Sequence, residues 1–100
     1  MKAFLIISGS GPMAILTSHD SVQDAVLLKK LQAKGIEKFI AYAIPLELAR
    51  QRYGRHFDLV CQDLNETDDL RVLDYNGQRA FALFRFDELA DPILHEPRRI

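Results

Sequence analysis

Apolar and polar positions form short blocks along the chain, and the first two blocks predict a pair of strands. Ala3–Ile7 is a continuous apolar run rich in β-branched and aromatic residues, which is typical of a strand buried on both faces. Met13–Thr17 predicts a second strand, joined to the first by the glycine-rich segment 8–12 as a hairpin loop. An alternative interpretation is that this segment opens a helix at Pro12, because proline suits the first helical position.

The next block, residues 22–34, has the spacing of a helix. Ser21 with Asp24 approximates the capping box that starts helices, and Gly35 suits the left-handed position that ends them. The apolar residues of this helix fall on two opposite sides, with Leu27, Leu28 and Leu31 on one and Val22, Val26 and Ala33 on the other. A helix that is apolar on two sides is expected to be covered on both or to contact a partner.

Two more strands are predicted on either side of a short helix. Lys38–Ile44 and Phe57–Cys61 are apolar runs of strand length. Between them, the helix covers 46–53 and ends at Gly54. This order favours a parallel strand pair joined by a right-handed crossover. Asp63–Asp69 then follows as an expected acidic loop.

The stretch Leu70–Phe86 carries the strongest local signal in the chain. Asn76-Gly77 lies between two runs of strand-forming residues, a pattern typical of a hairpin with a two-residue type I′ turn. A helical turn is expected over Asp87–Ala90. The tail 91–100 contains two prolines and is expected to be extended and partly disordered.

Together these elements predict a single domain over residues 1–100, of α+β or α/β class. The expected architecture is a two-layer domain with a mixed sheet of about six strands and two main helices. Its order along the chain is β-β-α-β-α-β-β-β. A chain of 100 residues suits one such domain and can bury a core without a disulfide or metal.

Charge and composition narrow the classes of partner. The chain has 13 basic and 14 acidic residues, a formal charge of −1, so its net charge does not steer it toward nucleic acid or an anionic membrane, although this leaves room for a local basic patch. Cys61 is the only cysteine, which excludes an internal disulfide. The apolar run after Lys2 stops after five residues, short of a signal peptide, and no run is long enough to span a membrane. We therefore expect a cytoplasmic protein.

Two polar loops offer candidate chemistry. In the first, the backbone amides of a glycine-rich loop can cradle an anion; its residues are Ser8, Gly9, Ser10 and Gly11. In the second, an imidazole beside a carboxylate offers a base near a hydroxyl; its residues are Ser18, His19 and Asp20. The simpler interpretation is a hairpin loop and a helix-capping loop, because neither the nucleotide-binding nor the hydrolase motifs are complete.

A basic group near the end of the predicted helix at 46–53 is the third candidate. It contains Arg50, Arg52, Arg55 and His56. These side chains can bind phosphate, an acidic partner or RNA, or they can simply stabilise the helix C-terminus.

No set of residues completes a catalytic or metal-binding constellation, and no cofactor is expected. Our leading hypothesis is a non-catalytic binding or regulatory module of unknown specificity, self-associating as a homodimer or binding a protein partner. The alternative is a small enzyme or an anion-binding protein that uses the two polar loops. A third hypothesis, binding of RNA through the basic group, is disfavoured by the balanced charge.

Overall fold

Five strands form one curved sheet in the computed structural model, which describes residues 1–67, 69–75 and 77–97, with only the backbone for 65–67, 77 and 78. The strands are β1 (Lys2–Ser8), β2 (Gly11–Thr17), β3 (Phe39–Ile44), β4 (Leu70–Asp74) and β5 (Ile93–His95). Their order across the sheet is β4-β2-β1-β3-β5, so β1 lies at the centre. Every strand pairing in the described part of the chain is antiparallel.

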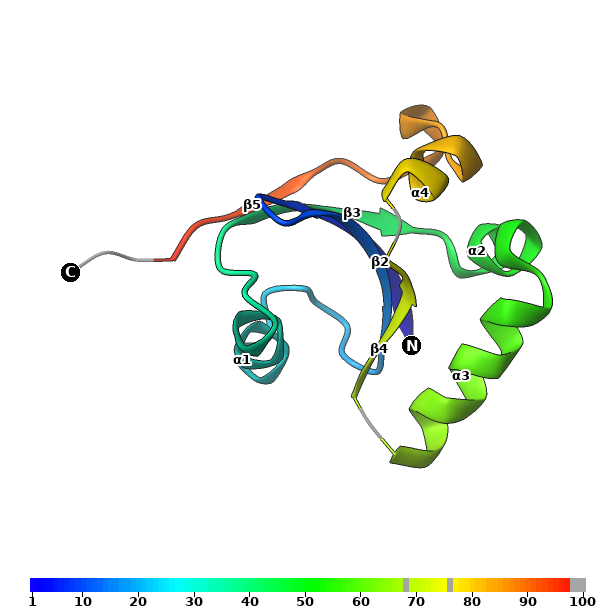
Figure 1. Ribbon diagram of the computed structural model, residues 1–100, viewed down its shortest axis with the longest axis horizontal. Helices are drawn as coiled ribbons and strands as arrows, with labels where there is room; N and C mark the ends of the chain where they lie inside the picture. The colour runs from blue at the N-terminus through cyan, green and yellow to red at the C-terminus, as the bar shows by residue number, and fades with distance from the viewer. Residues whose placement is uncertain (68, 76, 98–100) are drawn as a thin grey trace.

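Helices lie on both faces of this sheet. They are α1 (Ala25–Ala33), α2 (Leu46–Tyr53), α3 (Arg55–Thr67) and α4 (Gly77–Leu83), with a 3₁₀ turn η1 (Phe86–Glu88). Figure 1 shows α1 on the inner side of the curved sheet and α2, α3 and α4 on the outer side. The α2–α4 group forms the helical layer against the outer face, and among the described helices α1 packs against the inner face. The predicted α+β class is confirmed.

The first hairpin is confirmed, and it settles how the glycine-rich segment folds. Ser8 pairs with Gly11, and Ile7 pairs with Pro12, so Pro12 lies within β2 and does not open a helix. Gly11 has a φ of 104°, a conformation that favours glycine. Because β1 is covered on both faces, its residues 3–6 are all buried.

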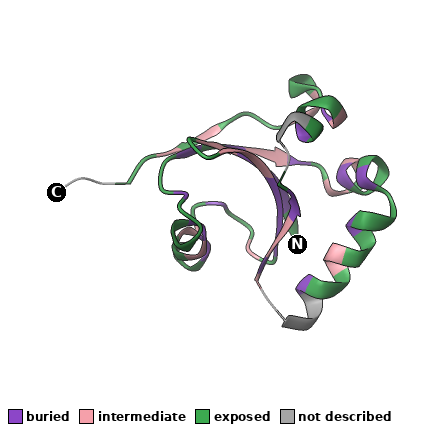
Figure 2. Cartoon of the chain, viewed as in Figure 1, coloured by how far each residue is buried: buried purple, intermediate pink, exposed green. Residues whose placement is uncertain are grey.

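Two hydrophobic cores, one on each face, hold the layers together. The inner core joins α1 to the sheet and contains Phe4, Ile6, Ile15, Leu27, Leu31 and Phe39 among its buried residues. The outer core joins α2, α3 and α4 to the sheet and contains Leu5, Leu16, Tyr53, Phe57, Leu73 and Phe84. In Figure 2 the buried positions follow the central strands and the sheet-facing sides of the helices. Burial on both faces explains the near-continuous apolar runs in β1 and β2.

The predicted strand Phe57–Cys61 is wrong, because these residues lie inside α3. Phe57, Val60, Cys61 and Leu64 contribute to the outer core at helical spacing, whereas Leu59 is 51% exposed. A strand would have placed Leu59 on the same face as Phe57. The expected parallel pair and its crossover are therefore absent, and most of the expected acidic loop 63–69 belongs to α3.

The predicted hairpin at Leu70–Phe86 is half right. β4 is a strand as expected, but 77–83 form helix α4 instead of the returning strand. The turn residue Asn76 lies outside the described residues. No residue from 78 to 86 is β-branched, and Ala80, Leu83 and Phe84 join the outer core at i, i+3 and i+4. Both properties favour a helix over a strand.

Helix α1 is shorter than predicted and is buried on one side. The residue that caps it is Asp24, whose Oδ1 accepts from the backbone N–H of Val26 at 2.9 Å. Val22 is buried ahead of the helix, whereas Val26 on its outer side is 48% exposed. The expectation of a helix covered on two sides is therefore wrong. As predicted, the chain turns after the helix at Gly35, with a φ of 84°.

The tail contains an edge strand. β5 pairs with β3 through Phe39–His95, Ile40–Leu94 and Ala41–Ile93. Pro92 and Pro97 bracket this three-residue strand in the sequence. The helical turn expected over Asp87–Ala90 is present one residue earlier, as η1. Residues 98–100 lie outside the described part of the chain, so the predicted disorder of the tail is not addressed there.

Candidate functional site

The glycine-rich loop between β1 and β2 is closed by its own serine. The hydroxyl of Ser8 donates to the carbonyl of Gly11 at 3.5 Å and accepts from the backbone N–H of Ser10 at 3.3 Å. Gly9 has no neighbouring atom within 4 Å of the position a side chain would occupy. The loop leads into a strand, so no helix dipole points at it. Its local contacts are those of a hairpin turn.

The Ser18–Asp20 segment fastens the far end of β2 to β4 and α1. The backbone N–H of Ser18 donates to the carbonyl of Asp69 at 3.1 Å. The imidazole of His19 places Nδ1 3.4 Å from Asp24 Oδ1 and Nε2 3.7 Å from Asp69 Oδ2. Lys30 Nζ lies 3.3 Å from the same Asp69 oxygen. These contacts give His19 two carboxylate neighbours. Their structural effect is to attach the Ser18–Asp20 loop to the start of α1 and to the start of β4.

The two polar loops do not form a joint cleft. They lie at opposite ends of β2, which is seven residues long. At about 3.3 Å per residue, such a strand separates its ends by roughly 20 Å. An enzyme or anion site that uses both loops at once is therefore not assembled by this fold.

The basic group also points in several directions. Arg52 donates to the Glu88 carboxylate from both terminal guanidinium nitrogens, Nη2 at 2.7 Å and Nη1 at 3.2 Å, and Nη1 also donates to the carbonyl of Leu83. This contact holds the pKa of the Glu88 carboxyl below its ordinary value and links α2 to η1. Arg50 lies over the ring of Phe57, 5.5 Å from its centroid.

The remaining two members of that group have different surroundings. Nε2 of His56 donates to the carbonyl of Leu73 at 2.7 Å, which links α3 to β4. Arg55 is exposed at the start of α3. Three of the four basic side chains therefore make contacts within the fold, and they do not converge on one anion site.

A buried polar pair lies under α4. The hydroxyl of Tyr53 donates to Asp74 Oδ2 at 3.1 Å, and both residues are buried. Burial raises the pKa of the Tyr53 hydroxyl above its ordinary value, and the negative charge of Asp74 adds to the rise. The Tyr53 ring also packs against Phe84, with centroids 5.8 Å apart. Tyr53 lies on α2 and Asp74 on β4, so their hydrogen bond joins these two elements.

We expect this pair to make the domain sensitive to alkali. Above about pH 10 the unfolded chain loses the Tyr53 proton while the folded chain keeps it, so the free energy of unfolding falls as the pH rises. The slope from one such proton is at most about 1.4 kcal/mol per pH unit. Urea unfolding at pH 8 to 11 should show a shallower decline in Tyr53→Phe than in the wild type. Tyr75→Phe is the control, since Tyr75 is 73% exposed, and an equal change in both variants would contradict the prediction.

An apolar surface extends over the end of the outer sheet face that the helices leave open. Ile40 and Leu94 are paired neighbours on β3 and β5 and are 37% and 57% exposed. Tyr42 lies on the same face as Ile40, and its ring contacts that of Phe86, which in turn contacts Phe81. We call this surface the outer apolar strip; its residues are Ile7, Ile40, Tyr42, Phe81, Phe86 and Leu94.

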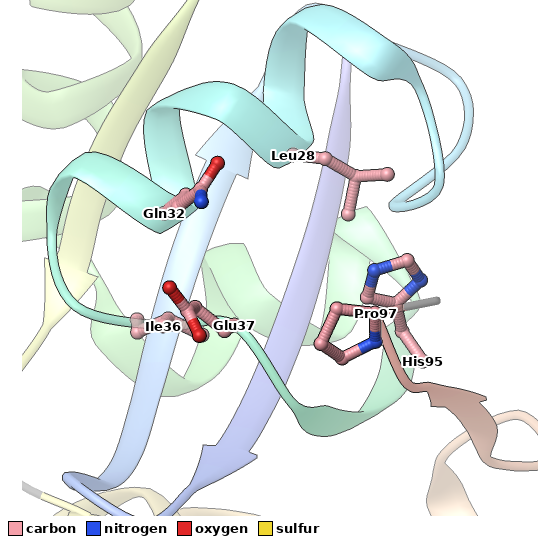
Figure 3. A pocket seen from close by; sticks show the side chains of 6 residues that line it. All are labelled: Leu28, Gln32, Ile36, Glu37, His95 and Pro97. Atoms are coloured by element: carbon pink, nitrogen blue, oxygen red, sulfur yellow. The ribbon is translucent and has the colours of Figure 1, made fainter. Parts of the chain in front are cut away.

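A hollow lies on the opposite, inner side, between α1 and the C-terminal segment. Its volume is about 140 Å³. We call it the α1–β5 hollow; it is lined by Leu28, Gln32, Ile36, Glu37, His95 and Pro97. Figure 3 shows Gln32 and Glu37 on one side and His95 and Pro97 on the other. The imidazole of His95 stacks on the buried ring of Phe39, with centroids 5.1 Å apart.

Sequence patterns did not identify either surface, since each combines residues from distant parts of the chain. The strip joins β1, β3, α4, η1 and β5, and the hollow joins α1 to the last described residues. The one available signal in the sequence is the surplus of large apolar residues near the C-terminus, which includes Phe81, Phe86 and Leu94.

Comparisons with known proteins identify no relative of this chain. No family model matches the chain, and neither a curated protein nor a solved structure does. Within the described residues, no helix combines the length and apolar character needed to cross a bilayer. The same part of the chain gathers no three metal-binding side chains. The fold and its surfaces therefore define a class, a small α+β domain with an open apolar strip and a hollow on opposite faces.

Proposed function

We propose that this chain is a non-catalytic protein-binding module that self-associates through the outer apolar strip. The observation that carries the proposal is the continuity of half-exposed apolar side chains from Phe81 through Phe86 to Leu94. Single exposed apolar residues are ordinary on protein surfaces, but contiguous patches mark interaction sites.

The size of the strip suits the centre of a modest interface. Four of its side chains keep between 37% and 57% of their surface exposed. Together they present on the order of 300 Å² of apolar surface, the range in which patches on monomers are often functional. A typical partner buries about 800 Å², so the surrounding polar residues would supply the rest as a rim.

The charges around the strip permit a second copy of the same chain as partner. A two-fold interface brings each surface against itself, so any patch of one sign would repel its own image. Arg85 and Asp87, on either side of Phe86, carry opposite charges and are ion-paired with each other. With a formal charge of −1, two copies repel each other only weakly at long range.

Leu94→Lys is expected to weaken self-association at least tenfold in Kd, because a lysine at the centre of the interface must lose its hydration. Sedimentation velocity over a range of concentrations measures the effect. Leu59→Lys is the matched control, since Leu59 is 51% exposed on α3 outside the strip. If the wild-type chain stays monomeric at high concentration, the proposal of self-association is wrong. If both variants raise the Kd equally, the outer apolar strip is not the surface through which the copies associate.

A further inference from the structure

We infer that the α1–β5 hollow binds a small organic cation, an ammonium group carried on an apolar body about the size of a benzene ring. This inference does not rest on self-association, since the hollow lies on the inner face of the sheet and the strip on the outer one.

The size and walls of the hollow fit such a body. Its volume is about 140 Å³, close to that of cavities of about 150 Å³ that accept benzene in another protein. Leu28, Ile36 and Pro97 supply apolar walls. The ring of His95 is held flat by stacking on Phe39, which is itself only 2% exposed. A flat apolar ligand therefore meets three apolar side chains and a ring whose orientation is set by stacking.

The polar groups of the hollow favour a positive charge. Glu37 supplies a carboxylate, and Gln32 supplies a neutral amide from the opposite end of the same wall (Figure 3). Within the described part of the chain, the structure records no ion pair for Glu37. Its sequence neighbour Lys38 is engaged elsewhere, with Nζ 3.0 Å from Glu96 Oε1. The carboxylate of Glu37 is therefore the charge that a ligand in the hollow would meet.

Helix α1 adds a second reason for a cation. The hollow lies at its C-terminal end, where backbone carbonyls give a helix a partial negative charge. The carbonyls of Gln32 and Leu31 in the last turn already accept from the backbone N–H groups of Gly35 and Ile36 at 2.9 Å, so the helix contributes its dipole field and these two carbonyls are not free acceptors. Lys34 follows this turn but does not line the hollow. The dipole and the carboxylate thus act in the same direction.

A neighbouring hollow leaves room for larger ligands of the same kind. It has a volume of about 420 Å³, shares Glu37 and Pro97 with the first, and adds Lys38 and Glu96. A substituent of the ligand that extends past Glu37 would enter this space. The ammonium group therefore determines whether a ligand binds, whereas the size of its substituent can vary.

Benzylammonium is a suitable probe, and NMR shift titration of the full ¹⁵N-labelled chain is the measurement. We expect saturable shifts at Leu28, Gln32, Glu37 and His95, with a Kd on the order of 1 mM for so small a ligand. Neutral benzyl alcohol, with the same ring, should bind at least fivefold more weakly, and benzoate should not bind. Equal binding of the alcohol, tighter binding of benzoate, or no saturable shift with benzylammonium would overturn the inference.

Glu37→Gln tests the carboxylate directly. This exposed substitution keeps the shape of the side chain, and we expect it to raise the Kd for benzylammonium at least fivefold. Glu47→Gln, an exposed carboxylate on α2 at the other face of the sheet, is the matched control and should leave the Kd unchanged. An unchanged Kd in Glu37→Gln, or the same rise in both variants, would overturn the assignment of the charge to Glu37.

Discussion

Phe57→Ala is expected to lower the free energy of unfolding by about 3–5 kcal/mol, the usual cost of removing a buried aromatic ring. Phe57 is 1% exposed and lies in the outer core, where α3 packs against the sheet beside Tyr53 and Leu64. The ring is too large for these neighbours to fill its space by small shifts, so a cavity remains. Urea unfolding at neutral pH measures the loss.

Leu59→Ala is the control that makes this experiment decisive for the local structure. Leu59 lies two residues after Phe57 on α3 and therefore on a different side of the helix, where its side chain is 51% exposed. Its replacement should change the free energy of unfolding by no more than about 0.5 kcal/mol. Large losses in both variants would instead indicate a strand, in which both side chains share a face.

Gly54→Ala is expected to cost about 1–3 kcal/mol, because it forces a side chain into a backbone conformation that glycine adopts freely. Gly54 joins α2 to α3 with a φ of 62° and a ψ of −135°. No atom lies within 4 Å of the position of an added Cβ, so the cost comes from the backbone and not from a clash. Chemical denaturation measures it.

Gly9→Ala separates this strain from the general effect of losing a glycine. Gly9 also has open space around it, and its φ is not among the positive ones. The free energy of unfolding of Gly9→Ala should lie within about 0.5 kcal/mol of the wild-type value, or slightly above it, because alanine lowers the conformational entropy of the unfolded chain. Equal losses at Gly9 and Gly54 would show that the α2–α3 corner carries no special strain.

The sequence predicted best where one pattern excluded the others. The hairpin of β1 and β2, the strand β3 and the helix α2 all have long or well-bounded signals, and all are present. Short apolar runs were ambiguous. Residues 57–61 are equally consistent with a strand and a helix face, and only their packing against the sheet decides. Asn-Gly at 76–77 suggested a turn, but the residues after it lack the β-branched side chains of a strand.

Candidate sites were harder to predict than elements, for a geometric reason. Polar loops stand out in a sequence, and Ser8–Gly11 and Ser18–Asp20 are therefore the candidates that it indicates. In the structure their hydroxyl, imidazole and backbone groups contact each other or neighbouring elements. The strip depends on Ile40 lying opposite Leu94, and this register exists only once β5 has paired with β3. No spacing in the sequence encodes that pairing.

The prolines beside β5 bear on how an exposed apolar surface avoids uncontrolled aggregation. A free sheet edge next to apolar side chains is a template on which further chains can add and grow into fibrils. Pro92 and Pro97 lack the backbone N–H that such growth requires, and the four residues between them include only the three of β5. Extension of the sheet strand by strand is therefore opposed at this edge.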